Sequence, residues 1–289
     1  MTMPRLATAV VVAFTAAILV ACSSENTTQT GTTPDGNSAA DERAVGHVHG
    51  LGVDPADGTL YVASHYGVFR VEGDQQQRVA DRWQDTMGFT VVGPKHFLGS
   101  GHPDLAEDLP PLLGLIESTD AAETWEPVSL LGEADLHAIE AVGDYIYALD
   151  AATQSLIVTT DRQRWDSIFS APFLDIAANQ ADPGTVYATT NNGDLVRSIE
   201  QTAPAPVDGA PTLSTIDWQP DGPLVGVTAN GIVMVSEDGE SEWSEAGTLD
   251  GPAEALDVTP GRWHAATATG IFESTDDGKT WNLVLPGDG

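Results

Sequence analysis

The stretch STDDGKTW, from Ser274 to Trp281, recurs in weaker copies along the chain. The segment from Ser118 to Trp125, STDAAETW, keeps the serine, aspartate, threonine and tryptophan but has Ala122 in place of the glycine. Two weaker copies and a remnant begin at Thr159, Ser236 and Ser198. The starting positions 118, 159, 198, 236 and 274 differ by 41, 39, 38 and 38 residues, and such even spacing indicates a repeated structural unit.

Each copy of the motif follows the same kind of sequence, in which apolar and polar residues alternate on either side of a short turn. The runs 60–71, 186–197 and 263–274 show this pattern with a glycine in the turn, which predicts β-hairpins. A further short apolar run precedes each hairpin, at residues 49–53, 87–91, 137–141, 174–178, 215–218 and 255–258.

Four strands in roughly 40 residues are typical of a β-propeller blade, and no long helical periodicity interrupts them. We therefore predict an all-β protein, a six-bladed β-propeller over residues 43–289. The predicted blades are at about 45–84, 85–134, 135–172, 173–211, 212–252 and 253–289.

The repeated motif has a structural explanation. Its aspartate can accept hydrogen bonds from amides of the turn, its glycine can take a positive φ, and its tryptophan can pack beneath the turn. We assign this structural role, and no catalytic one, to Ser118, Asp120, Trp125, Asp161, Trp165, Ser236, Asp238, Trp243, Ser274, Asp276, Gly278 and Trp281.

Over residues 60–289 these motifs resemble the Asp-box, or bacterial neuraminidase repeat. The resemblance implies the propeller fold but not one function, because the repeat occurs in sialidases, other glycosyl hydrolases, sortilin-type receptors and photosystem assembly factors. Four short segments, HVHGL from residue 47, SHYGVFR from 64, DTMGF from 85 and GHP from 101, resemble a group of exported bacterial propellers that are labelled glycosylhydrolases by similarity. No established activity comes with this second resemblance.

The N-terminus has the organisation of a secretory signal. Its apolar stretch, 6–20, is too short for a typical transmembrane helix. The residues LVAC at 19–22 resemble a bacterial lipobox, which implies a signal peptide at 1–21 and lipidation of Cys22. After this cysteine, residues up to 42 include no aromatic or large aliphatic side chain, so 22–42 is predicted to be a flexible tether. We expect an exported lipoprotein, anchored to the membrane through Cys22 on the extracytoplasmic side.

The net charge excludes one class of partner. The chain has 43 Asp and Glu against 11 Lys and Arg, a formal net charge of −32. Binding to nucleic acid or to anionic lipid headgroups depends on dense cation–phosphate contacts, which this surface cannot supply. We expect no nucleic-acid partner, and a protein kept soluble and monomeric by its charge.

Five of the seven histidines fall where first strands begin or where second strands turn into third strands. In a propeller these positions meet at one mouth of the central channel. Together with nearby acids and one thioether they give the candidate ligand residues His47, His49, His65, Asp85, Met87, His102, Asp135 and His137.

These residue types suit a metal ion. His47 and His49 lie two residues apart on a predicted strand, so their imidazoles share one side of the pleat. Nitrogen, oxygen and thioether donors suit copper if Met87 takes part, and zinc or another divalent ion otherwise. The alternative is that these histidines only hydrogen-bond the backbone, a structural role that we expect of His96 and His264.

A sialidase is the enzymatic alternative, and its resemblance implies three convergent arginines with a tyrosine nucleophile. The positions of the arginines argue against a sialidase, because Arg162 and Arg164 fall in a motif turn on the face opposite to the histidines of the mouth. Tyr66, next to His65, is the candidate tyrosine of a sialidase-like hydrolase acting on extracellular glycans. For another glycoside hydrolase, the candidate catalytic residues are Asp85 and Asp135, with Asp175 as a further acid near a strand start.

A third alternative is an assembly or scaffolding factor similar to the photosystem-type propellers. The proline-rich insertion at 103–114 would then be a lid or the contact for an exported protein partner. The sequence leaves the binding module, the glycoside hydrolase and the scaffolding factor open.

Overall fold

The computed structural model describes residues 45–287. The predicted signal peptide at 1–21, the lipidation site Cys22 and the tether at 22–42 lie outside the described residues.

The described chain forms six antiparallel four-stranded sheets, and each sheet uses four strands that are consecutive in the sequence. Blade 1 consists of β1 (Val48–Val53), β2 (Leu60–Ser64), β3 (Gly67–Glu72) and β4 (Gln75–Arg78), and blade 2 of β5 (Asp85–Gly93), β6 (His96–His102), β7 (Leu115–Ser118) and β8 (Glu126–Ser129). Blade 3 consists of β9 (Leu136–Val142), β10 (Tyr145–Asp150), β11 (Ser155–Thr159) and β12 (Asp166–Ser170), and blade 4 of β13 (Phe173–Ala178), β14 (Thr185–Thr190), β15 (Leu195–Ile199) and β16 (Ala205–Pro206). Blade 5 consists of β17 (Thr215–Trp218), β18 (Leu224–Val227), β19 (Ile232–Ser236) and β20 (Ser244–Thr248), and blade 6 of β21 (Ala255–Thr259), β22 (Arg262–Thr267), β23 (Gly270–Ser274) and β24 (Asn282–Pro286).

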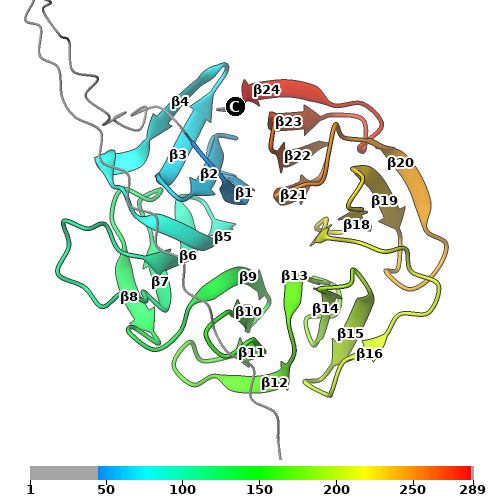
Figure 1. The fold of residues 1–289 in the computed structure, drawn as a ribbon, viewed down its shortest axis with the longest axis horizontal. Helices are drawn as coiled ribbons and strands as arrows, with labels where there is room; N and C mark the ends of the chain where they lie inside the picture. The colour runs from blue at the N-terminus through cyan, green and yellow to red at the C-terminus, as the bar shows by residue number, and fades with distance from the viewer. Residues whose placement is uncertain (1–44, 288–289) are drawn as a thin grey trace, which may run out of the picture. The chain divides into compact units, whose positions relative to one another are not determined.

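The blades are arranged around a central axis with the first strand of each blade innermost (Figure 1). Each first strand contacts the first strands of both neighbouring blades, and β1 contacts β21, which closes the ring. Because every described blade is built from its own four strands, the ring closes by packing of blade 6 against blade 1 and not by exchange of a strand. The predicted six-bladed β-propeller is confirmed.

Helix is nearly absent from residues 45–287, where the one helical element is a short 3₁₀ turn, η1 (Val79–Asp81). Within the same range, no helix has the length and apolar character needed to cross a membrane.

The hydrophobic core is divided into clusters that join neighbouring blades. One cluster combines Leu98 and Leu115 of blade 2 with Leu136, Ile139 and Ala148 of blade 3, all of them buried. Equivalent clusters contain residues of the other blade pairs. The alternation of apolar residues in the sequence therefore serves contacts between sheets, as expected for strands that are covered on both faces.

The repeated motif forms the hairpin between the third and fourth strands. In blade 6, Ser274 accepts a hydrogen bond from the amide of Gly278 at 3.0 Å, and Asp276 accepts one from the amide of Thr280 at 2.9 Å. Gly278 has a φ of +77°. Ala122 occupies the matching position in blade 2 with a φ of +67°, a left-handed conformation that costs an alanine more than a glycine.

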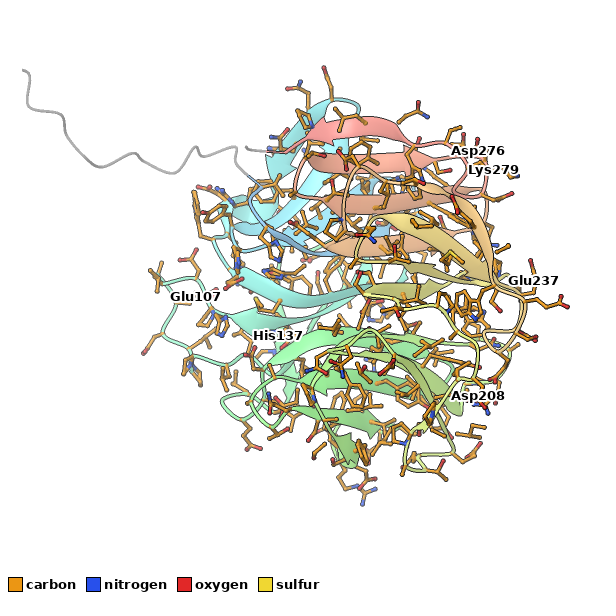
Figure 2. The ribbon with its side chains drawn as sticks, turned by 45° about the vertical axis from the view of Figure 1, so that its right-hand side comes forward. Glu107, His137, Asp208, Glu237, Asp276 and Lys279 are labelled. Atoms are coloured by element: carbon orange, nitrogen blue, oxygen red, sulfur yellow. The ribbon has the colours of Figure 1, made fainter. Side chains whose placement is uncertain are left out.

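The motif hairpins and the histidines at the starts of the first strands lie on opposite faces of the propeller, because each motif joins the third strand of a blade to the fourth, at the end opposite to the start of the first strand. Figure 2 labels Asp276 and Glu237, in the motif hairpins of blades 6 and 5, and His137, at the start of the first strand of blade 3. The motif face therefore does not contribute to the site described next.

Candidate functional site

The histidine mouth is the end of the central channel at which the first strands begin. A bulge interrupts the pairing of the first and second strands there in four blades, between Val48 and Gly50, Thr86 and Gly88, Ala138 and Leu136, and Phe173 and Asp175. The residues inside these bulges are His49, Met87, His137 and Leu174. Because a bulge redirects the side chain that it contains, the four residues take equivalent places around the mouth.

Three ligand-type side chains meet at this mouth. His49 comes from the bulge of β1, His65 from the turn between β2 and β3, and Asp85 from the start of β5. The distance from His49 Nε2 to His65 Nδ1 is 3.2 Å, and the distance from His65 Nδ1 to Asp85 Oδ1 is 2.9 Å. His49 Nε2 lies 3.9 Å from Asp85 Oδ1. One nitrogen of each histidine and one oxygen of Asp85 therefore lie within 4.8 Å of one another, close enough to share one metal ion.

The cluster combines a buried side with an open side. The side chain of His49 is only 10% exposed, whereas those of Asp85 and His65 are 28% and 45% exposed. Burial, together with the charges that His65 and His47 carry when protonated, lowers the pKa of His49 to about 4. His49 is therefore neutral at pH 7, the protonation state that a metal-ligating imidazole needs.

The remaining candidates extend the cluster on both sides. His47 Nδ1 lies 3.1 Å from Glu254 Oε1, and its ring centroid is 4.9 Å from that of His49. On the other side, His102 Nδ1 lies 3.3 Å from Asp85 Oδ2. Asp85 thus faces the histidine cluster with one oxygen and His102 with the other.

In blade 3, an imidazole and a carboxylate continue the alternation of histidines and acids along the mouth. His137 Nε2 lies 3.1 Å from Asp135 Oδ2, and His102 Nε2 lies 3.9 Å from Asp135 Oδ1. Asp135 Oδ1 is buried without a hydrogen-bond partner among the described residues. The structure therefore brings together all five histidines that the sequence placed at the mouth, with both aspartates.

Two other predicted residues lie in blades 1 and 2. Met87 is half-buried in its bulge, two residues after Asp85 on the same strand. The ring of Tyr66 packs 6.1 Å from that of Trp83 and against Gly46.

The two histidines expected to be structural are bound within blades. His96 Nε2 lies 2.6 Å from Glu117 Oε1. His264 is fully buried, with Nε2 3.2 Å from Glu273 Oε2 and Nδ1 3.5 Å from Asp257 Oδ2. Arg262 is the first residue of β22 and also contacts Glu273.

The central channel contains a cavity of about 350 Å³ that opens beside the cluster. Its lining comes from the first strands of all six blades and includes His47, His49 and His137 at the mouth. No arginine or lysine is among the described residues that line it.

Carboxylates that sequence reasoning mostly missed line this cavity. They belong to Glu140, Asp175, Asp217 and Asp257, on the first strands of blades 3 to 6, and only Asp175 is among the residues that the sequence predicts. A signal was present, because each acid interrupts an otherwise apolar run such as HAIEA or ALDV. An acid inside an innermost strand can face only the channel or a neighbouring blade.

Burial sets the pKa values of these acids. It raises the pKa of Asp175 to about 7, although the amides of Ile176 and Ile216 each donate a hydrogen bond of 2.9 Å to its carboxylate. Burial, with the charges of neighbouring carboxylates, also raises the pKa of Glu140 and that of Asp217 well above their usual values. Burial therefore disfavours the charged forms of these channel acids.

Asp175 is expected to make stability depend on pH. A carboxyl whose pKa is higher in the folded chain contributes stability that is present below the unfolded pKa, near 4, and is lost as pH rises through the folded pKa, about 7. Between pH 5 and pH 7, wild-type protein should lose about 2 kcal/mol of unfolding free energy that the Asp175→Asn variant keeps. The side-chain amide of the variant accepts one hydrogen bond fewer than the carboxylate does, but the stability lost in this way does not vary with pH.

Urea unfolding at pH 5, 6, 7 and 8 measures this difference between the two chains. Asp208→Asn is the control, because it removes the same charge from an exposed position. Parallel pH profiles for wild type and Asp175→Asn would contradict the assignment.

Comparisons with known proteins define the fold and no more. No protein-family model and no curated protein matches the chain. Among solved structures, the chain is similar to one of the nidogen/laminin complex, with a TM-score of 0.61 and 11% identity over 79% of this chain and 93% of that one. It is also similar to the structure of YCF48 bound to D1 peptide, with a TM-score of 0.51 and 15% identity over 83% of this chain and 82% of that one.

A third similar structure is an extracellular domain. It comes from a protein of B. thetaiotaomicron named as a hybrid two-component system, with a TM-score of 0.56 and 14% identity over 84% of this chain. The match covers 33% of that chain. The fold and the mouth thus define this chain as a six-bladed β-propeller with a histidine and aspartate cluster at one end of its channel, and its structural neighbours include extracellular domains.

Proposed function

We propose that this protein is an exported, membrane-anchored binding module that holds one zinc ion at the histidine mouth. The observation that carries the proposal is the convergence of His49, His65 and Asp85, from three separate segments of two blades, within 4.8 Å. Three protein ligands with an open fourth position are the arrangement of zinc sites that bind a further molecule.

The donor set favours zinc over the copper alternative. Two imidazole nitrogens and one carboxylate oxygen are ordinary zinc ligands, whereas the copper alternative rested on the thioether of Met87. Affinity for N and O ligands is nonetheless higher for copper than for zinc in general. The test of metal binding must therefore include copper as well as zinc.

The neighbouring residues suit an outer shell. His102 contacts the second oxygen of Asp85, so it can orient that carboxylate, as hydrogen-bonded groups around metal ligands commonly do. His47 is held in turn by Glu254.

Export and anchoring rest on the N-terminal sequence. The lipobox-like residues 19–22 support lipidation at Cys22, and the extracellular domains among the structural neighbours agree with an extracytoplasmic location. The strongly acidic chain would favour the approach of cations to such a site.

The metal content of the purified full-length chain tests the proposal. After incubation with excess zinc and gel filtration, we expect close to one zinc per chain by inductively coupled plasma mass spectrometry, and its loss on treatment with a chelator. Retention of copper but not zinc would move the assignment to copper. No stoichiometric metal under either loading would overturn it.

The same contacts weaken the glycoside hydrolase alternative. Asp85 and Asp135 are each engaged by imidazole nitrogens, and none of the described residues that line the cavity is an arginine that could hold a sugar carboxylate.

Binding of an exported protein partner is a second candidate function, because the 103–114 insertion presents a fully exposed leucine, Leu105. The loop is fixed next to it, where Asp104 accepts a hydrogen bond from the amide of Trp83 and Glu107 pairs with Arg82. Leu105→Asp should abolish co-purification of such a partner and leave zinc content unchanged, and an unaltered set of co-purifying proteins would remove this candidate.

A further inference from the structure

The central channel has the size of a ligand pocket. Its cavity of about 350 Å³ falls within the range of about 300–1,000 Å³ that small-molecule sites occupy. Six first strands enclose it, and its lining includes apolar side chains of Leu51, Phe89, Ile139 and Leu256 as well as the acids. A small molecule can therefore enter from the mouth and contact both apolar and charged groups.

The charge inside this cavity is of one sign. Glu140, Asp175, Asp217 and Asp257 line its interior and Glu254 its mouth, and no lysine or arginine is among the described lining residues. Arg262, which lies in blade 6, is paired with Glu273 and with the main-chain oxygen of Gly58 instead. Within residues 45–287, the channel acids thus have no lysine or arginine partner, and the basic groups beside them are the imidazoles of His47, next to Glu254, and His264, next to Asp257.

Backbone amides satisfy only some of these carboxylates. The amides of Trp218 and Val258 donate to Asp217 at 2.7 and 2.6 Å. Asp257 Oδ2 is buried and has no hydrogen-bond partner among the described residues. Behind it the fully buried His264 has its Nδ1 without such a partner, 3.5 Å from that same oxygen.

Burying carboxylates without cations beside them costs electrostatic free energy. The raised pKa values of Glu140 and Asp217 reflect it, because burial and mutual repulsion both disfavour their charged forms. A cation that enters the channel removes this repulsion and gains attraction from several carboxylates in surroundings where charge is poorly screened.

The geometry favours an organic cation over a bare metal ion. Within residues 45–287, the one group of three or more ligating side chains with atoms inside 4.8 Å is the cluster of His49, His65 and Asp85. The channel acids stand further apart, so they do not form a coordination sphere for one ion. A primary ammonium group can reach separated carboxylates with its three N–H donors while its alkyl chain contacts the apolar wall.

We propose that the channel binds a small aliphatic amine, with its ammonium group held by Glu140, Asp217 and Asp257. This site is distinct from the zinc cluster and does not depend on it. The same carboxylates would exclude anionic ligands, sugar acids included.

Calorimetric titration of the full-length chain with putrescine tests the proposal. We expect saturable binding of putrescine and none of 1,4-butanediol, which has the same carbon chain without the charges. Glu140→Gln should weaken putrescine binding by at least about 10-fold, because one ionic partner is lost. Glu140 is the residue to change first, since Asp217 also holds two main-chain amides.

Two matched variants guard against an effect on folding. Asp208→Asn removes a charge from an exposed loop and should leave the affinity for putrescine unchanged. Asp257→Asn should weaken putrescine binding as Glu140→Gln does, and both channel variants should keep the zinc content of wild type.

Three results would overturn the proposal. They are equal binding of butanediol and putrescine, equal affinities of Glu140→Gln and Asp208→Asn for putrescine, and stoichiometric binding of calcium in the channel with no binding of putrescine. None of these results bears on the zinc cluster, so failure of this proposal is distinguishable from failure of the proposed function.

Discussion

Replacing His49 with alanine is expected to weaken zinc binding by more than about 100-fold, beyond the 10–100-fold that loss of an outer-shell partner typically costs. His49 is the best-buried member of the cluster, and its Nε2 is the atom that faces both His65 and Asp85. Its loss leaves only His65 and Asp85, two ligands that cannot enclose an ion. Competition titration against a chromogenic zinc chelator measures the change.

His96→Ala is the matched control, because it removes an imidazole that is bound to Glu117 and lies outside the cluster. The control should retain the zinc affinity of wild type. If His49→Ala binds zinc as tightly as His96→Ala does, the three-ligand site is wrong.

The second large effect concerns stability. Replacing Trp263 with alanine is expected to lower the free energy of unfolding by about 3–5 kcal/mol, as for other large aromatic residues in cores. Trp263 is 2% exposed on β22, and its indole N–H donates a 2.9 Å hydrogen bond to Gln219 of blade 5. Its ring also lies directly against Gly278 of the motif turn, where an added Cβ would stand 2.6 Å from a ring carbon.

Denaturant unfolding of Trp263→Ala and Trp263→Phe separates the two contributions. The phenylalanine keeps most of the packing and loses the hydrogen bond, so we expect a loss of about 1–2 kcal/mol. A loss below about 1 kcal/mol in the alanine variant would contradict the view that this tryptophan joins blades 5 and 6.

The fold could be predicted because its unit repeats. The motif at Ser274, its copies at about 40-residue spacing and the alternating runs before them each point to the same hairpins, and six such units require a ring. The bulges at the start of four first strands could not be predicted, because one residue such as His49 or Leu174 without a pairing partner leaves no mark in the alternation.

The site was predictable in part. The strand order is the same in every blade, so the starts of the first strands and the turns between second and third strands all lie at one mouth of the channel. His49, His65 and Asp85 could therefore be grouped from the sequence. The channel acids were not recognised as a set, because 43 acids in the chain make a single acid uninformative. Met87 follows Asp85 by two residues on β5 and stays a predicted ligand.

Anomalous X-ray diffraction near the zinc edge, from crystals of zinc-loaded protein, tests the central claim most directly. We predict one strong peak per chain at the histidine mouth, about 2.0–2.2 Å from His49 Nε2, His65 Nδ1 and an oxygen of Asp85. Absence of a peak there, or peaks confined to exposed acids of the motif face, would contradict the account and return these histidines to a structural role.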